Sequence, residues 1–316
     1  MAEYIATRDA YGKKLVQLGK KHPEIVVLDA DLSKSTRTNW FANEFPKRFF
    51  DMGVAEQNMM NTAAGLAACG KVPFASSFAI FAAGRVWDQV RNTICYSNLN
   101  VKIVATHGGI SVGEDGCSHQ AIEDIALMRA IPDMTVIVPA DGPETSHAIE
   151  AAYHFKGPVY IRLGRSKVES VTDGKDDFII GKGKLLREGV EATVIACGMM
   201  VAETLKAACK LADENIEIRV VNMSTIKPID SDLIIESARK TGAVITAEEH
   251  VTIGGLGSAV AEVLGENFPV PMKMIGIRNR FGQSGPVDIL MKEYAIDADS
   301  IAEAVKGVIK RKQPIA

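Results

Sequence analysis

The chain has 316 residues, 47% of them hydrophobic and 24% charged, which is enough for two ordinary domains with full apolar cores. A formal net charge of −3 gives no electrostatic basis for binding nucleic acid or an anionic membrane surface, and no segment approaches the ~20 apolar residues of a membrane span. The first residues show an amphipathic helical pattern with no signal-peptide core, and the five cysteines are scattered without a CxxC pair, so we expect a cytoplasmic protein with reduced thiols.

Short β-branched runs alternate with longer helical periods, a pattern that predicts parallel α/β sheets. In the first half, strands are expected at residues 25–28, 48–51, 72–75, 101–105, 135–138 and 159–162, and helices at 58–68, 84–97, 123–129 and 143–155. The apolar periodicity then fades, and the segments VTDGKDD and GKGK bring charge and glycine, so residues 167–185 are expected to form a linker. A second series follows, with strands at 192–196, 218–222, 243–247 and 272–276 and helices at 201–214, 230–241 and 256–267.

Polar residues follow the expected strands of the first half, at the point where each strand ends. In open parallel sheets, ligands bind just past the carboxyl ends of the strands. Six strands are followed in this way, by Asp29 and Asp31, by residues 53–56, 76–81 and 107–119, by Asp141 and by Arg165. This repetition predicts one ligand-binding rim on the first domain.

Residues 51–60, DMGVAEQNMM, contain one carboxylate, Glu56, between a strand-like run and a helix of small residues. No lysine or arginine stands beside it in the sequence, and an acid among Met, Val, Ala and Gly must be solvated, paired or partly protonated. Such an acid can hold a ring nitrogen in an apolar cleft. The alternative is a plain helix-capping acid, kept ionised by the helix N-terminus.

The segment SSFAIFAAG places Phe78 and Phe81 three residues apart after a strand. Their faces could hold a flat heteroaromatic ring by offset stacking, although an isolated pair of this kind is more often ordinary core packing.

The segment THGGISVGEDGCSHQ brings two histidines, two acids and four glycines within 15 residues after a strand. Glycines let the backbone approach a ligand, His107 and His119 can donate to hydroxyls or phosphate, and Asp115 can bind a sugar hydroxyl. The spacing lacks a recognised zinc pattern, and a polar surface loop is the remaining alternative.

Arg8, Ser35 and Arg165 suit a phosphate at the rim, although each alone is also an ordinary surface residue. GGLGSA, at residues 254–259, looks like a phosphate loop at a strand–helix junction, but its glycines could serve only close packing.

In order and spacing, these motifs resemble the C-terminal half of the transketolase family. The matching pieces are DMGVAEQNM, PFASSFAIFAAGRVWDQVR, ATHGGISVGEDGCSHQAIEDIALMRAIPDMTVIVPAD and YIRLGR, followed later by AEEHVTIGGLGSAVAEVL. Deoxyxylulose phosphate synthase shares the layout, but the Glu-Asp-Gly-x-x-His-Gln form looks more like transketolase. The beta subunits of 2-oxo acid dehydrogenases share the architecture and the glutamate without a good match to this loop.

The resemblance implies an α/β fold in two parts. A doubly wound parallel-sheet domain that binds the thiamin pyrimidine would span residues 1–166, and a smaller α/β transketolase C-terminal domain would span 186–316, with the linker between them.

Full-length transketolases also carry a diphosphate-binding domain, and no segment of this sequence resembles it. Its hallmark is Gly-Asp-Gly with a later Asn, and no Gly-Asp-Gly occurs in this sequence. We therefore expect the C-terminal subunit of a split transketolase, whose partner is an N-terminal subunit carrying that domain. The ligands of Mg²⁺ or Ca²⁺ should lie on the partner, and this chain should form a homodimer within an α2β2 assembly.

The family's cofactor roles carry over by position. Glu56 would activate the pyrimidine nitrogen of thiamin diphosphate, and Phe78 and Phe81 would line the aminopyrimidine pocket, with Phe81 the better stacking candidate. Asp31 and Leu32 would lie at the cofactor-facing edge of the first loop. The sequence has Ala55 and Gln57 where full-length transketolases commonly have Arg and His around this glutamate.

The substrate roles carry over in the same way. Arg8, Ser35, His107 and Arg165 would hold the sugar phosphate, Asp115 would recognise a hydroxyl, and His119 would sit near the reacting carbon. Glu56, His107 and His119 are the expected catalytic residues. Ala79 and Ala82 leave a less aromatic pocket wall than some relatives have, which bears on the choice of substrate.

The expected reaction is transfer of a two-carbon ketol unit from a ketose phosphate to an aldose phosphate. The alternatives are another thiamin enzyme, of the deoxyxylulose phosphate synthase type or a transketolase for an unusual sugar, and a non-catalytic subunit that stabilises a partner.

Overall fold

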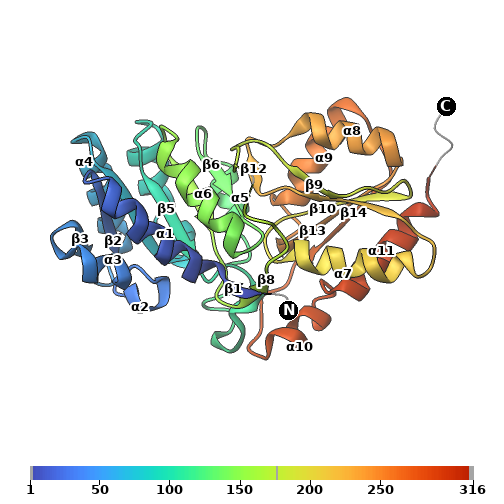
Figure 1. Ribbon diagram of the computed structural model, residues 1–316, viewed down its shortest axis with the longest axis horizontal. Helices are drawn as coiled ribbons and strands as arrows, with labels where there is room; N and C mark the ends of the chain where they lie inside the picture. Colours follow the sequence, from blue (N-terminus) through green and yellow to red (C-terminus); the bar gives the residue numbers. More distant parts are fainter. Residues whose placement is uncertain (1–2, 176, 313–316) are drawn as a thin grey trace.

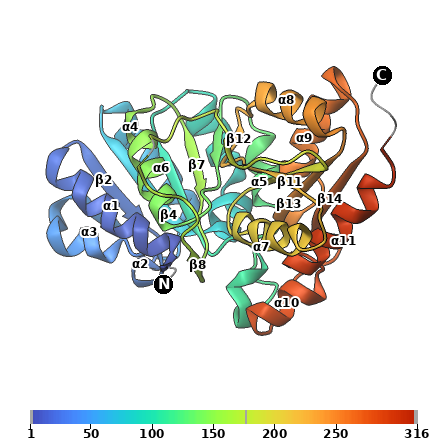
Figure 2. The same ribbon diagram turned by 45° about the vertical axis from the view of Figure 1, so that its right-hand side comes forward.

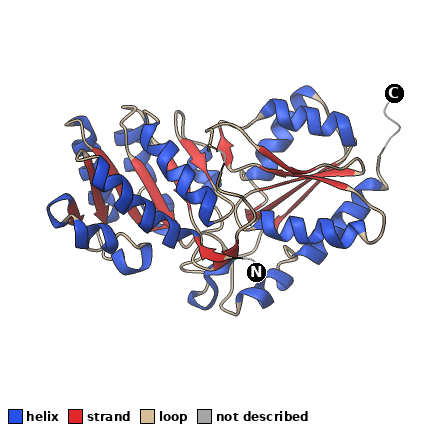
Figure 3. Cartoon of the chain, in the orientation of Figure 1, coloured by secondary structure: helices blue, strands red, loops and turns tan. Residues whose placement is uncertain are grey.

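The computed structural model describes residues 3–175 and 177–312 of the chain. Two β-sheets lie side by side, each with helices on both faces, and a short two-stranded ribbon lies between them (Figures 1 and 3). Every helix within these residues is too short or too polar to cross a lipid bilayer.

The first sheet has seven strands in the order β12-β6-β7-β5-β4-β2-β3. All neighbours pair in parallel except β12, which runs antiparallel to β6 at one edge. The strands are β2 (Ile25–Asp29), β3 (Phe49–Asp51), β4 (Val72–Phe78), β5 (Lys102–Thr106), β6 (Thr135–Ile137), β7 (Val159–Arg162) and β12 (Thr225–Lys227). The helices of this half are α1 (Thr7–Lys21), α2 (Ser33–Thr36), α3 (Asn39–Glu44), η1 (Pro46–Arg48), α4 (Glu56–Ala68), η2 (Phe81–Arg85), η3 (Gln89–Cys95), η4 (Ile110–Asp115), α5 (Asp124–Arg129) and α6 (Gly142–His154).

The central strands β2, β5 and β7 are buried at every position because both of their faces are covered. In β2, Ile25 and Val27 face the cluster built with Tyr11 and Leu15 of α1, whereas Leu28 points to the opposite cluster, which includes Met59 of α4. This alternation produces the doubly wound arrangement that the resemblance implies.

The second sheet has five strands in the order β14-β13-β10-β11-β9, parallel except for β9. Its strands are β9 (Lys184–Arg187), β10 (Ala192–Ala196), β11 (Ile218–Asn222), β13 (Val244–Val251) and β14 (Met272–Ile277). Its helices are α7 (Met200–Ala212), α8 (Ser231–Thr241), α9 (Leu256–Asn267), α10 (Val287–Glu293) and α11 (Ala298–Ile309). The apolar cluster beneath α8 and α9 continues into that beneath α4, so one core layer crosses both halves.

Each strand expected from the sequence is present, with ends shifted by a few residues. The helical stretch expected at 84–97 is present, but it consists of two π-helical stretches, η2 and η3, in place of one α-helix. The segment expected to be a linker contains β8 (Lys167–Glu169), which pairs antiparallel with β1 (Tyr4–Ala6). Strands β9 and β12 and helices α10 and α11 are not among the elements expected above. The limits placed at residues 166 and 186 stay a prediction.

Candidate active site

The candidate residues of the first half gather where the parallel strands end. Asp29, Phe78, Thr106 and Arg162 are the last residues of β2, β4, β5 and β7. Because neighbouring parallel strands end at the same edge of a sheet, the loops that follow them form one rim.

Glu56 is the first residue of α4 and only 3% exposed. Its Oε1 accepts a hydrogen bond of 2.7 Å from Nη1 of Arg85, whose side chain is 46% exposed. The sequence left open whether this acid is solvated, paired or protonated, and the structure shows it paired. The partner lies 29 residues further along the chain, at the end of η2, so no local pattern reveals it.

Phe78 and Phe81 lie with their rings nearly parallel, at a centroid distance of 6.1 Å and an interplanar angle of 13°. Phe78 is buried and stacks on the ring of His107 at 3.8 Å. Phe81 is partly exposed and has the guanidinium of Arg85 over its ring, 4.5 Å from the centroid. Arg85 therefore covers the face of Phe81 while it pairs with Glu56.

The π-helical turn that holds Phe81 and Arg85 explains how both reach the same place. A π-helix closes each turn with one more residue than an α-helix, and such turns are frequent at functional sites. Here the turn brings the first and last residues of η2 to the buried end of α4.

Arg8, Ser35 and His107 come together across three elements. Nη1 of Arg8 donates to the backbone oxygen of Ser35 at 3.1 Å and to Nε2 of His107 at 3.3 Å. Nε of Arg8 is buried and has no hydrogen-bond partner among the described residues. Burial lowers the pKa of Arg8, and the nearby Arg37 lowers it further.

His107 is neutral in this arrangement. Burial lowers the pKa of His107 to about 3, and the positive charges of Arg8 and Arg165 act in the same direction. Because Arg8 donates to Nε2, the ring proton belongs on Nδ1, which lies 2.8 Å from the hydroxyl oxygen of Thr106.

Asp115 and Arg165 also lie near each other, with 3.8 Å between Oδ1 and Nη1, and both are more than a third exposed. Arg165 donates to the backbone oxygen of Val112 at 2.5 Å, within the loop that carries Asp115. His119 lies further along that loop, edge-on to Phe81 at a ring distance of 5.6 Å. His107 and His119, at the two ends of the expected substrate loop, therefore contact the rings of Phe78 and Phe81.

Asp31 and Leu32 belong to the loop after β2, and Asp29 holds this loop in place. The backbone N–H of Leu32 donates to Oδ1 of Asp29, and the Thr36 and Thr38 hydroxyls donate to Oδ2, all within 2.8 Å. Asp31 has a positive φ of 61° and donates its N–H to Asp51. Burial raises the pKa of Asp29 to about 6.

The alternative of a phosphate loop at residues 254–259 is wrong for this helix end. The carboxylate of Glu248 accepts hydrogen bonds from the backbone N–H groups of Leu256 and Gly257, the donors that a phosphate would need. A Cβ at Gly255 would lie 2.1 Å from Glu248, so this glycine serves close packing. Within the described residues, no three or more His, Cys, Asp and Glu side chains are grouped to hold a metal ion.

Two family models match the chain: the transketolase pyrimidine binding domain over residues 3–170 and the transketolase C-terminal domain over residues 181–301. The chain belongs to the transketolase family. The α/β fold expected from the resemblance is confirmed as that of transketolase, with antiparallel strands β9 and β12 at two sheet edges.

Relatives of two lengths match this transketolase-family chain. A protein from Methanocaldococcus jannaschii described as a transketolase C-terminal section is 50% identical over 312 residues, 98% of each chain. A 6-deoxy-6-sulfo-D-fructose transketolase subunit from Clostridium sp. is 45% identical, over 96% of this chain and 95% of that subunit. The transketolase of Homo sapiens is 39% identical, and the match covers 98% of this chain but 50% of the human protein.

The similar solved structures also include one chain of matching length and one about twice as long. A split-gene transketolase described as an inactive beta4 tetramer has a TM-score of 0.92 at 55% identity, over 98% of this chain and 100% of that chain. Transketolase from Leishmania mexicana has a TM-score of 0.86 at 28% identity, over 100% of this chain and 47% of that chain. This transketolase-family chain therefore matches a C-terminal section and a split-gene chain along nearly their whole length, and about half of each full-length transketolase.

Proposed function

We propose that this chain supplies the pyrimidine side of a thiamin diphosphate site and transfers a two-carbon ketol unit from a ketose phosphate to an aldose phosphate. The observation that carries the proposal is the arrangement of Glu56, Arg85 and Phe81. The guanidinium of Arg85 is a flat, nitrogen-bearing group that donates to Glu56 while it covers Phe81. An aminopyrimidine ring has the same two needs, a carboxyl partner for its nitrogen and an aromatic face, so these residues fit it.

In this proposal, Glu56 binds the nitrogen of the pyrimidine ring and shares a proton with it. Phe81 stacks on this ring, and Phe78 lies next to Phe81 with its ring nearly parallel. When bound, the cofactor supplies the carbanion equivalent that accepts and passes on the two-carbon unit. Arg85 has to leave Glu56 first. Its side chain is 46% exposed and can swing into solvent, whereas Glu56 is fixed at the start of α4.

The terminal anion of the sugar would bind at Arg8, His107 and Arg165. The buried Nε of Arg8 has no partner among the described residues and offers a donor for this anion. His107 stays neutral through the physiological range because its pKa is lowered to about 3, so it binds through a hydrogen bond and not through charge. Ser35 takes part through its backbone oxygen, which orients Arg8. Asp115 would accept from a sugar hydroxyl, and His119 would move a proton near the reacting carbon.

The diphosphate and its Mg²⁺ or Ca²⁺ would be held by a separate N-terminal subunit. The match to half of the human transketolase supports this division. We propose that this chain forms a homodimer that joins two partner chains in an α2β2 assembly. The solved beta4 tetramer, described as inactive, is consistent with a chain that needs such a partner.

The test is transketolase activity of this chain alone and after mixing with the candidate N-terminal subunit, thiamin diphosphate and Mg²⁺. We expect activity in the mixture only. Activity of the chain alone would refute the shared site. In the active mixture, Glu56→Ala should lose several kcal/mol of transition-state stabilisation. Unchanged turnover would make this chain the non-catalytic, partner-stabilising subunit.

A second candidate is a transketolase for an unusual sugar. Its support is the similarity to a 6-deoxy-6-sulfo-D-fructose transketolase subunit, at 45% identity, and to an apulose-4-phosphate transketolase subunit, at 35%. The cationic pair Arg8 and Arg165 would accept a sulfonate as readily as a phosphate. Product analysis with xylulose 5-phosphate and ribose 5-phosphate, compared with 6-deoxy-6-sulfofructose, separates the two candidates.

A further inference from the structure

The segment from Gly109 to Gln120 carries Asp115 and His119, and its own backbone does little to fix its conformation. Gly109, Gly113 and Gly116 all have positive φ, at 85°, 81° and 74°, and a kink at Gly113 interrupts η4. Glycine costs more conformational entropy to order than other residues, so a loop with three such positions needs support from its surroundings.

The first support is the side chain of Gln120, which is 2% exposed. Its Nε2 lies within hydrogen-bond distance of the backbone oxygens of Ile110 and Gly113, inside the loop. The shortest contact, 2.8 Å, is to the backbone oxygen of Gln283, which lies in the C-terminal half just before α10. Gln120 therefore ties the two ends of the loop to each other and to the second half.

The residues around Gln283 also hold the middle of the loop. The Ser284 hydroxyl donates to the backbone oxygen of Glu114 at 2.6 Å, directly before Asp115. Gly282 packs so closely that an added Cβ would lie 1.8 Å from Oε1 of Gln120. The loop, in green-cyan at the bottom of Figure 2, lies beside α10.

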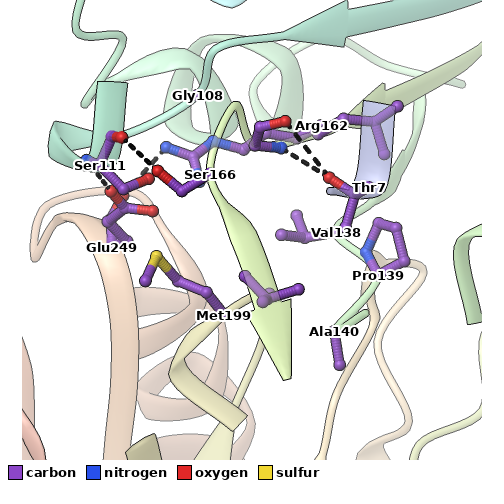
Figure 4. Close-up of a pocket in the computed structure, with 14 residues that line it drawn as sticks. Thr7, Gly108, Ser111, Val138, Pro139, Ala140, Arg162, Ser166, Met199 and Glu249 are labelled. Carbon is purple, nitrogen blue, oxygen red and sulfur yellow. Dashed lines mark hydrogen bonds between the residues drawn. The ribbon is translucent and has the colours of Figure 1, made fainter. Parts of the chain in front are cut away.

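A third support comes from Glu249, which is 4% exposed and lies near the end of β13. Its carboxylate accepts from the backbone N–H of Ser111, and the Ser111 backbone oxygen accepts from the Ser166 hydroxyl at 2.9 Å (Figure 4). Nη2 of Arg162, at the end of β7, donates to the backbone oxygen of Glu249. The start of the loop is thus fixed between the two sheets.

We infer that the C-terminal half positions the substrate loop, with Gly282, Ser284 and Glu249 as positioning residues for Asp115 and His119. The contribution to substrate binding rests on the proposed function, whereas the support of the loop does not. The second half thus acts within the active site, although none of its residues touches the substrate in this proposal.

Hydrogen–deuterium exchange of the whole chain tests the support of the loop directly. Gly282→Ala should force Gln120 aside, and its backbone φ is outside the left-handed region, so the close contact is the sole source of strain. Ser284→Ala removes one donor from an exposed position. We expect exchange within residues 109–120 to become about fivefold to tenfold faster, the effect of losing about one hydrogen bond.

Matched controls separate this effect from general loosening. Gly285→Ala changes a glycine in the same segment whose Cβ would meet Leu290 at an ordinary 3.4 Å. Ser284→Thr keeps the hydroxyl and should restore the slow exchange. Lys306→Ala removes surface ion pairs on α11 and should leave residues 109–120 unchanged. Unchanged exchange in both Gly282→Ala and Ser284→Ala would overturn the inference.

Kinetics of the reconstituted complex test the positioning. Gly282→Ala should raise KM for the sugar phosphate several-fold while the Kd for thiamin diphosphate stays constant, because Glu56 and Phe81 are held by other elements. Faster exchange with an unchanged KM would overturn the positioning role. If the wild-type complex shows no transketolase activity but the variant loop still exchanges faster, the proposed function fails and the support of the loop stands.

Discussion

Replacing Arg85 by alanine should tighten the binding of thiamin diphosphate to the reconstituted complex. In the structure, Arg85 pairs with Glu56 and covers the face of Phe81, so in the proposed site the cofactor would have to break these contacts to bind. A charge-assisted hydrogen bond contributes about 1.5–3 kcal/mol. Because Arg85 is 46% exposed, solvent screening reduces this to about 1–1.5 kcal/mol.

The contact of Arg85 with the ring of Phe81 adds about 0.5 kcal/mol at such an exposed site. The sum, about 1.5–2 kcal/mol, corresponds to a Kd for the cofactor about 10–30 times lower in Arg85→Ala, at 1.4 kcal/mol per tenfold. Titration calorimetry or quenching of intrinsic fluorescence measures this Kd without turnover.

Arg91→Ala is the matched control, because Arg91 lies in the neighbouring π-helical stretch and bonds to Asn92 instead of to Glu56. Its Kd should equal that of the wild type. A Kd that is unchanged or higher in Arg85→Ala would refute the competition between Arg85 and the cofactor. It would show that Arg85 contributes to the bound state at least as much as to the free one.

Four further predictions concern stability and the metal. The pKa of His107 is lowered from 6.5 to about 3, so between these values the unfolded chain binds a proton that the native chain does not. The free energy of unfolding therefore falls as pH drops below 6.5. In urea unfolding, His107→Asn should flatten this slope by up to about 1.4 kcal/mol per pH unit. The pKa of Asp29, raised from 3.8 to about 6, has the opposite sign, and Asp29→Asn should remove a loss of stability that occurs as pH rises from about 4 to 6. Asp124→Ala should cost about 3–5 kcal/mol because it leaves the buried guanidinium of Arg162 unpaired, and a normal urea midpoint would contradict this. Chelation of the divalent metal should abolish activity of the mixture without lowering the Tm of this chain, and a lower Tm would place metal ligands here.

The sequence predicts the strands well where both faces are covered by helices. The runs that became β7, β10 and β11 are short and rich in valine and isoleucine, so the signal is local. The three-residue strands β1 and β8 depend on each other across more than 160 residues, and neither run is long enough to give a pattern alone.

The candidate site shows the same limit. Glu56, Phe81 and His119 could be proposed because each stands in a recognisable motif, and the structure brings all three near Arg85 or Phe81. Arg85 and Glu249 could not be assigned, since their roles come from contacts with residues 29 and 138 positions away. Both residues stand in segments that resemble transketolase, FAAGRVWDQ and AEEHV, but nothing in these segments indicates the distant partner.

Strand β12 limits how this protein can be cut or recombined. Its residues, Thr225–Lys227, come from the second half of the chain but form the outer strand of the first sheet, against β6. A fragment that ends between the two sheets would leave β6 paired with β7 alone and its other edge open, and such an open edge invites pairing with other chains. The pyrimidine-binding half expressed alone should therefore self-associate, and a functional chimera should exchange both halves or graft β12 together with the first.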